Sequence, residues 1–518
     1  MQTGRIAFLF VAMVLACCDP GEISQRAALG RPRSVLGELV EMSVSRTLIK
    51  NGVIVSMDAG IGDLPRGDLL IEGDRIADIG PSLSVDAGEV IDAAGMIVMP
   101  GLVNAHIHLW QTALRGLGSD WAGSDYYNYL HANLTPRYRP EDTYIGTLVG
   151  ALNQLDCGTT TVFDWCHNNS TPAHTDAAID GLEESGVRAV FGHGTVKPKP
   201  KEGEAHFSTV PHPASEIHRL RATRFTSDDR RVTLAMAILG PDYATLEVNL
   251  HDFRLARELD LLSSAHVWGR ENRLVPEGYR TIAREGLLGP DHNISHGNYM
   301  LDDEIQAICD CGASMTSTPP MEIRGHVKEP VIGKVIAAGG RPSIGVDSEV
   351  AVPGDMFNAM RIALQVQRIY DNQAHVARIE RGQDEDAAEF ARENLKVIGT
   401  GGSLVKELSV STRQALEWAT IDNAKALRLE HKIGSLKPGK QADILLLDTD
   451  SLNVLPVNDP VQCIVFHANK SNVDTVFVAG RKMKERGELT LEAADLARRK
   501  RELVGSGQWL LAESGLLK

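Results

Sequence analysis

The sequence predicts an α/β protein: an eight-stranded parallel (β/α)₈ barrel, the TIM barrel, with a small β-sandwich formed by both chain ends. Eight short apolar runs alternate with helical stretches between residues 98 and 424, and each run ends in polar or ionisable residues. This alternation is typical of a parallel sheet or barrel. Short β-branched runs broken by turn residues flank the region on both sides, so the two ends can pair into one module.

Residues 1–41 precede the first strand pattern. The apolar run 7–18 ends in VLACC and resembles a signal peptide, including the lipoprotein kind, although it is too short to span a membrane. Met42 lies almost directly before the first strand, so the other interpretation is an over-extended start. Free thiols in the rest of the chain favour that interpretation and a cytoplasmic location. Export or lipid anchoring through residues 1–20 is the alternative.

The two β-rich ends are expected to form the sandwich. Residues 45–97 contain the runs TLIKNGVIVSMD, DLLIEGDRIADIG and VIDAAGMIVMP, which are broken by Gly, Asp and Asn as in a β-meander. Residues 425–490 contain ADILLLD, CIVFHAN and VDTVFVAGRKM, preceded by the turn sequence KPGK. Residues 491–518 are expected to form a C-terminal helical segment.

The middle region, 98–424, is expected to supply the barrel. Its eight apolar runs are MIVMPGLVNAHIH, GTTTVFDWCHN, VRAVFGHGT, RVTLAMAILGPD, LLSSAHVWG, NISHGNYM, ASMTSTPPME and RPSIGVDSE. In a barrel of this class the catalytic side chains lie at the C-terminal ends of the strands. The polar residues that close each run are therefore the candidates for chemistry.

Composition and charge exclude several functional classes. Hydrophobic residues make up 43% and charged residues 23% of the 518 residues, as in a globular enzyme. The formal charge of −15 argues against binding to nucleic acid or anionic membranes and favours a small, neutral or cationic substrate. The seven cysteines include no C-x-x-C pair, so neither a disulfide scaffold nor a cysteine-zinc site is expected.

Four histidines and one aspartate lie at or just past predicted strand ends. His106 and His108 are two residues apart, so on a strand both imidazoles point to one face and can chelate one cation. The fifth, sixth and eighth runs supply His266, His296 and Asp347. Neutral imidazoles with one carboxylate suit a divalent ion such as Zn²⁺, which lowers the pKa of bound water toward about 7 and yields a hydroxide nucleophile.

These motifs, in this order, resemble a known family. The segments PGLVNAHIHLWQTALRG, SHGNYMLDDE, GVDSEVAVPGDMF and SLKPGKQADILLLD are similar to those of the amidohydrolase superfamily. The resemblance spans about residues 45–490. It is strongest to the aminohydrolase and chlorohydrolase branch, which includes cytosine and guanine deaminase-like enzymes and triazine hydrolases.

The resemblance implies roles for the candidate residues. His106, His108, His266 and Asp347 match the ligands of a single metal ion, most simply Zn²⁺, with Fe²⁺ or Mn²⁺ as alternatives. His296 matches the histidine that polarises the substrate or orients the water, and Asp347 also matches the base that takes the proton of the water. The two-metal variant uses a modified lysine on the fourth strand, and RVTLAMAILGPD contains none.

One position departs from the family pattern. The branch usually has a glutamate three residues after the fifth-strand histidine, and here that position is Gly269. In deaminases that glutamate protonates a ring nitrogen, so its absence removes the usual proton shuttle. Glu271 and Glu322 are the candidate replacements, and each can equally be structural.

The expected function is metal-dependent hydrolysis of a non-peptide carbon–nitrogen bond in a small heterocycle, by attack of metal-bound hydroxide. Trp110, Gln111 and His193 are expected to line the substrate pocket, with packing or structural roles as the alternatives. The expected partners are a small-molecule substrate and, by resemblance alone, further copies of the chain, but no nucleic acid. Two alternatives stay open: an amide, carbamate or carbon–halogen hydrolase, and a catalytically silent exported binding protein.

Overall fold

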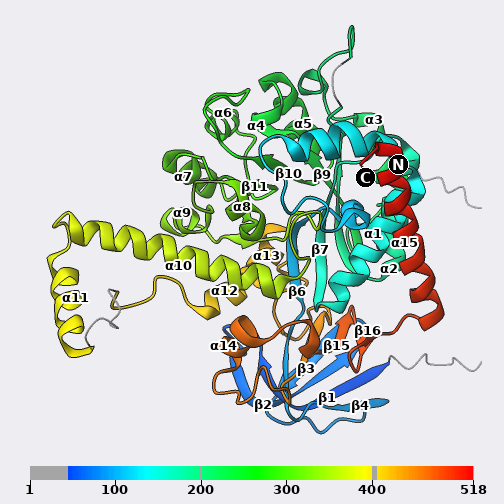
Figure 1. Cartoon of the computed structure of the whole chain (residues 1–518). Helices are drawn as coiled ribbons and strands as arrows, with labels where there is room; N and C mark the ends of the chain where they lie inside the picture. Colours follow the sequence, from blue (N-terminus) through cyan, green and yellow to red (C-terminus); the bar gives the residue numbers. More distant parts are fainter. Residues whose placement is uncertain (1–44, 199–200, 399–404, 517–518) are drawn as a thin grey trace, which may run out of the picture. The chain divides into compact units, whose positions relative to one another are not determined.

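The computed structural model describes residues 45–198, 201–398 and 405–516 (Figure 1). The segment 1–41, with its two possible interpretations, and Met42 lie outside these residues. Within the described ranges, no helix is both long and apolar enough to cross a bilayer.

Eight parallel strands form the predicted barrel, and each predicted run coincides with one of them, although the strand at NISHGNYM begins one residue earlier, at His292. The hydrogen-bonded order follows the chain from the first strand to the last: β6 (Leu102–Ile107), β7 (Thr159–Cys166), β8 (Arg188–Gly194), β9 (Val232–Ile238), β10 (Leu262–Val267), β11 (His292–His296), β12 (Ser314–Ser317) and β13 (Ser343–Ile344). Ile107 pairs with Asp347 across the two edges, and the Asp347 amide donates to the His106 carbonyl at 2.9 Å. The nearly closed barrel confirms the predicted fold.

Helices follow each barrel strand, and most of them cover the outside of the barrel. Two that come after the last strand, Met356–Glu380 and Glu385–Ile398, extend away from the barrel (Figure 1). The helices of this region are α1 (Pro140–Asp156), α2 (Pro172–Ser185), α3 (Ala214–Thr223), α4 (Gly240–Tyr243), α5 (Leu246–Glu258), α6 (Tyr279–Arg284), α7 (Asp302–Asp310), α8 (Pro319–Gly325), α9 (Ile332–Ala337), α10 (Met356–Glu380), α11 (Glu385–Ile398), α12 (Thr412–Trp418) and α13 (Ile421–Ala426). After the barrel come α14 (Pro460–Gln462) and α15 (Ala493–Ser514), and α15 packs along α1.

The two chain ends join in one nine-stranded sheet, as the sequence predicts. Its strands are β1 (Arg46–Val55), β2 (Asp63–Glu72), β3 (Arg75–Gly80), β4 (Glu89–Asp92), β5 (Met96–Pro100), β14 (Ile444–Asp448), β15 (Val473–Val478), β16 (Arg481–Glu485) and β17 (Glu488–Leu489). The ends meet where β5 pairs antiparallel with β14. Apolar side chains from both ends, including Ile49, Val98 and Leu446, form one buried cluster.

A single glycine separates the sheet of the chain ends from the barrel. The run MIVMPGLVNAHIH, read as one strand, is two: β5 ends at Pro100, Gly101 follows, and β6 begins at Leu102. A Cβ at Gly101 would lie 2.2 Å from the Thr160 side chain, so only glycine fits between β6 and β7 here. The boundaries given above for the domains stay predictions.

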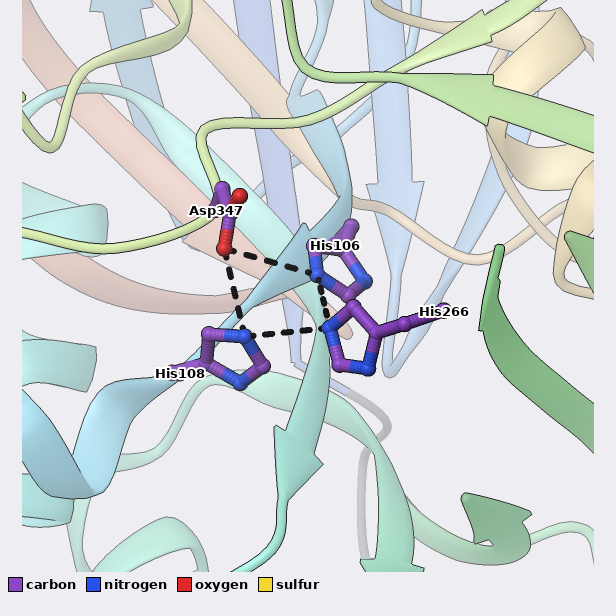
Figure 2. A group of neighbouring side chains, drawn as sticks. All are labelled: His106, His108, His266 and Asp347. Carbon is purple, nitrogen blue, oxygen red and sulfur yellow. Dashed lines mark hydrogen bonds and ion pairs between the residues drawn. The ribbon is translucent and has the colours of Figure 1, made fainter. Parts of the chain in front are cut away.

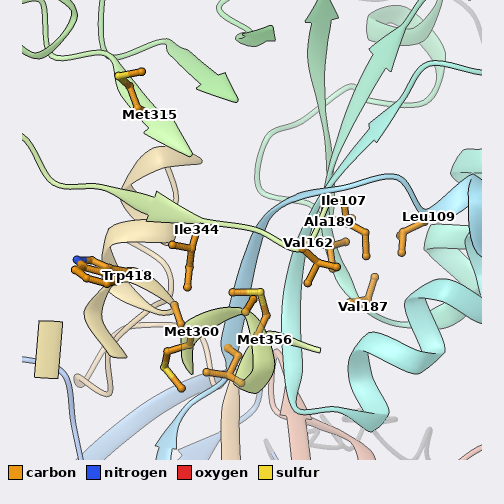
Figure 3. Packing of buried hydrophobic residues seen from close by; sticks show 14 of the residues in the cluster. Ile107, Leu109, Val162, Val187, Ala189, Met315, Ile344, Met356, Met360 and Trp418 are labelled. Carbon is orange, nitrogen blue, oxygen red and sulfur yellow. The ribbon is translucent and has the colours of Figure 1, made fainter. Parts of the chain in front are cut away.

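Apolar packing between the strands and the helices holds the barrel strands in place. Figure 3 shows Val162 and Ala189 on neighbouring strands packed with Ile107, and Ile344 packed near Met360 of α10. All eight residues of β7 are buried, because parallel strands in a barrel are covered on both faces. This rigid frame fixes where the strands end, and the polar side chains of the site project from those ends.

Candidate metal centre and cavity

Three imidazoles and one carboxylate converge at the C-terminal ends of the barrel strands (Figure 2). His106 lies in β6, His108 just after it, His266 in β10 and Asp347 after β13. Their ligand atoms all lie within 4.8 Å of one another. His266 Nε2 is 3.1 Å from His106 Nε2 and 3.3 Å from His108 Nε2, and Asp347 Oδ1 is 3.2 Å from His108 Nε2.

The remaining ring nitrogens show that this group fits a cation. His108 Nδ1 lies 2.6 Å from the Trp165 carbonyl, which only accepts, so Nδ1 carries the proton and Nε2 is a bare lone pair. Adjacent Nε2 atoms this close repel one another unless a proton or a cation lies between them. Two ligands of a tetrahedral zinc with bonds of about 2.0 Å are about 3.3 Å apart, which matches the observed separations.

Burial favours the protonation states that bind a metal. All four side chains are buried. Desolvation lowers the pKa of His106 to about 4 and that of His266 well below its ordinary value, so both rings are neutral at pH 7. Burial opposes ionisation of Asp347, but the neighbouring His106 and His108 lower its pKa well below the ordinary value. His106 and His266 thus offer neutral imidazole nitrogens, and Asp347 offers a carboxylate.

Two residues of the site are held in a backbone conformation that side chains avoid. His296 and Asp347 have φ values of +76° and +77°. A non-glycine residue in this region costs about 1 kcal/mol, and such strain gathers at functional sites. The hydrogen bond from the Asp347 amide to His106 and the one from the His108 amide to the Asp347 carbonyl, both 2.9 Å, hold this turn against the edge of β6.

His296 lies between Asp347 and a second acid. Its Nε2 is 3.8 Å from Asp347 Oδ2, and its Nδ1 is 3.3 Å from Glu322 Oε1. Glu322 is fully buried in α8 and accepts from the Ser317 hydroxyl and the Thr318 amide, both at 2.7 Å. Glu322 therefore contacts the ring of His296 from behind and does not line the cavity.

A cavity of about 650 Å³ opens above the metal centre and is rich in aromatic side chains. Trp268 stacks between His296 and His326, with ring centroids 4.2 and 4.0 Å away. The aromatic residues that line the cavity with Trp268 are Trp121, Tyr126, Tyr127 and Tyr243. This lining suits a flat, unsaturated ring bound against the metal centre.

The three residues expected to line the cavity lie behind its wall or away from it. The Trp110 indole donates to His167 Nδ1 at 3.2 Å, and the Gln111 amide donates to the Tyr126 hydroxyl at 2.9 Å. Both thus orient residues that do line the cavity. His193 bonds His212 at 3.0 Å, and neither ring reaches the cavity.

The position of the usual family glutamate cannot hold a side chain. Gly269 has φ of +79°, and a Cβ there would lie 2.4 Å from Met300 Cγ and 2.8 Å from the Met300 amide nitrogen. Glu271, two residues later, is exposed and does not line the cavity. The structure thus leaves Glu322, through His296, as the candidate shuttle nearer to the metal centre.

Comparisons with known proteins agree with this fold. The sequence profile of the amidohydrolase family matches residues 97–483. The chain belongs to the amidohydrolase family. As an amidohydrolase it is an enzyme that hydrolyses carbon–nitrogen bonds, as the sequence motifs predict.

Curated relatives match most of the chain. A 5'-deoxyadenosine deaminase of Methanothermobacter thermautotrophicus is 26% identical over 439 residues, which cover 83% of this chain and 91% of the relative. A 5-methylthioadenosine/S-adenosylhomocysteine deaminase of Moorella thermoacetica is 27% identical over 474 residues, which cover 88% of this chain and 97% of the relative.

Solved structures share the fold. An adenosine deaminase from Xanthomonas campestris with bound zinc has a TM-score of 0.69 at 20% identity, covering 90% of this chain and 99% of that chain. An atrazine chlorohydrolase from Arthrobacter aurescens, complexed with zinc, has a TM-score of 0.71 at 19% identity, covering 88% of this chain and 100% of that chain.

The sequence-based prediction missed several residues that line this amidohydrolase cavity. Lys197 lies three residues after β8 and Trp268 directly after β10. A signal for both was therefore present, because catalytic side chains in a barrel lie just past the strand ends. His131 lies in the π-helical segment η2 (Tyr126–Leu134), far from any strand end. Only the folded loop between β6 and α1 brings His131 to the cavity.

Proposed function

We propose that this amidohydrolase is a metal-dependent aminohydrolase that removes an amino group from a ring carbon of a small, planar heterocycle. The observation that carries the proposal is the donor set His106, His108, His266 and Asp347 at the base of an aromatic cavity. The deaminase names of its relatives support the same chemistry.

We propose that the group holds one divalent ion, Zn²⁺ before Fe²⁺ or Mn²⁺. The donors are three imidazoles and one carboxylate, nitrogen and oxygen ligands of the kinds that zinc binds. The zinc named in the two solved structures supports this choice. When bound, such an ion supplies a Lewis acid that makes water nucleophilic near neutral pH.

The protein's own side chains move the protons. Asp347 accepts the proton of the attacking water at Oδ2, the oxygen that faces His296. His296 Nε2 then carries a proton toward the leaving amino group, while Glu322 at Nδ1 holds the ring and stabilises its charged form. This route gives the site an acid although Gly269 replaces the family glutamate. Glu322 thereby acts through His296 as a positioning residue.

The test is ammonia release from aminopurines, aminopyrimidines, pterins and triazines by the zinc-loaded enzyme, with and without chelator. The proposal predicts chelator-sensitive ammonia release. It also predicts that Asp347→Asn abolishes turnover while the protein stays folded by circular dichroism. Full activity of Asp347→Asn would show that the proton does not pass through this carboxylate.

A second candidate is hydrolysis of an amide, carbamate or carbon–halogen bond. Gly269 favours it, because these leaving groups do not need a ring nitrogen to be protonated by a carboxylate at that position. Release of a carboxylic acid or halide without ammonia, from the same metal-loaded enzyme, would decide for this candidate.

We also propose a cytoplasmic location and a homo-oligomeric enzyme that does not bind nucleic acid. The five cysteines of the described residues are all free, which suits a reducing compartment. The charge of −15 opposes binding to nucleic acid. Mass spectrometry of the native N-terminus and light scattering of the purified protein test the first two points. A mature N-terminus at Cys17 or Cys18 would instead indicate export.

A further inference from the structure

The cavity contains a buried cation that the chemistry above does not use. Lys197 follows β8, is 9% exposed, and lines the cavity with the metal centre. Its ammonium lies 4.3 Å from the centre of the Tyr243 ring and 6.0 Å from that of Trp165. Among residues 45–198, 201–398 and 405–516, no carboxylate lies within 4.0 Å of this ammonium, and it makes no hydrogen bond to them.

One acid acts on Lys197 electrostatically without pairing with it. This acid is Asp242 of α4. Asp242 Oδ2 accepts from the amides of Trp268 and Gly269, at 2.8 and 3.0 Å, and its Oδ1 is buried without a hydrogen-bond partner. Among the described residues, the one acid that lines the cavity is Asp347, which belongs to the candidate metal-ligand group. A buried charge without a partner is costly, so a lysine in this position calls for an anion from outside the chain.

Two histidines of the cavity lie near enough to Lys197 for its charge to act on both rings, and they add hydrogen-bonding capacity. His167 accepts the Trp110 indole proton at Nδ1, so its Nε2 carries the ring proton and is a donor. His131 lies with its ring centre 4.8 Å from that of His167, and its Nδ1 is buried without a partner. Both rings are more than nine-tenths buried and line the cavity.

From this cluster we propose that Lys197, with His131 and His167, forms a subsite for an anionic oxygen group, so that the substrate is a heterocyclic amine bearing a carboxylate. The inference rests on the proposed function, because the metal centre is where the amino group is placed. The overall charge of −15 favours a neutral or cationic substrate, but the cavity differs locally: Lys197, Arg270 and Arg324 line it against Asp347 alone.

Of the three cations, only Lys197 is buried and, within the described residues, without a hydrogen bond or ion pair. Arg324 donates to the carbonyls of Gly118, Ser119 and Trp121 and thereby ties α8 to that loop. Arg270 is exposed at the rim, with its guanidinium 4.9 Å from the Tyr299 ring.

The test compares two matched ligand pairs on the zinc-loaded enzyme: adenosine 5'-carboxylate with 5'-deoxyadenosine, and pterin-6-carboxylate with pterin. Calorimetry gives Kd for a ligand that is not turned over, and initial rates give KM and kcat for one that is. We expect at least one carboxylate to bind about ten- to a hundredfold more tightly than its neutral partner, the range of a charge-assisted hydrogen bond. Adenosine 5'-monophosphate separates a phosphate preference from a carboxylate preference.

Three variants identify the residue responsible. Lys197→Met is expected to bring the ratio of carboxylate to neutral affinity close to one, and Lys197→Arg to keep part of the preference. Arg270→Met is the matched control, a cation removed from the rim, and is expected to keep the preference. Metal content, measured for each variant, shows that the metal centre is intact.

Several results would overturn the inference. One is equal affinity of the wild-type enzyme for the neutral and the carboxylate ligands. Another is a preference for carboxylate ligands that survives in Lys197→Met or disappears in Arg270→Met. If Lys197→Met lowers kcat for neutral and anionic substrates by the same factor, Lys197 acts as a proton donor and not as an anion-binding residue. A carboxylate preference without ammonia release from any ligand would leave the subsite in place and refute the proposed aminohydrolase activity.

Discussion

Gly269 offers a direct test of why this chain lacks the family glutamate. Replacing it by alanine puts a side chain at φ of +79° and a Cβ 2.4 Å from Met300 Cγ. The left-handed conformation alone costs about 1 kcal/mol. Overpacking adds about 1–3 kcal/mol, since Met300 is buried and its amide is held by the Gly297 carbonyl at 3.0 Å. We expect Gly269→Ala to lower the free energy of unfolding by about 2–4 kcal/mol.

The matched control is Gly286→Ala, which separates strain from crowding. Gly286 has φ of +67° but no atom within 4 Å of a Cβ, so its variant carries the conformational cost alone. Urea unfolding followed by tryptophan fluorescence measures both. If Gly269→Ala is no less stable than Gly286→Ala, crowding by Met300 does not explain the glycine, and a side chain at 269 is tolerated.

Three further predictions follow from buried groups. Glu322→Gln should lower kcat about ten- to a hundredfold at unchanged metal content, because the ring of His296 loses its acidic partner; an unchanged kcat would make Glu322 purely structural. Arg188→Met should destabilise the fold by about 3–5 kcal/mol in urea, since it leaves Asp443 buried without its 2.7 Å ion pair between the barrel and the sheet of the chain ends; a loss below about 1 kcal/mol would contradict this. Burial lowers the pKa of His292 to about 3. Below pH 6.5 the unfolded chain therefore binds a proton at His292 that the folded chain does not bind, and the free energy of unfolding falls as the pH drops from 6.5 toward 3. His292→Gln should therefore lose about 2 kcal/mol less than the wild type between pH 7 and pH 5, and an equal loss would show that His292 is not the group responsible.

The sequence predicts the barrel and the convergence of the candidate metal ligands well because both follow from local pattern. Every barrel strand coincides with an apolar run, and His106, His266 and Asp347 come from the ends of strands whose order the barrel dictates. The period of two in H-x-H places His106 and His108 on one face without any tertiary information. These features can be predicted from the sequence and the rules of strand geometry alone.

The walls of the cavity could not be predicted in the same way, because loops and tertiary contacts build them. His131 reaches the cavity through a π-helical segment with no sequence signature. Trp110 and Gln111 directly follow the metal-binding motif, yet the turn after β6 directs them behind His167 and Tyr126. The reason for Gly269 becomes visible only when Met300, from a different strand end, is packed against it.

Metal analysis of the purified protein, wild type beside His266→Ala, tests the central claim most directly. The account predicts one divalent ion per wild-type chain, most of it lost in His266→Ala, with ammonia release falling in proportion to the metal. Turnover that persists in metal-free protein, or two ions per chain, would contradict a single-metal hydrolase built on His106, His108, His266 and Asp347.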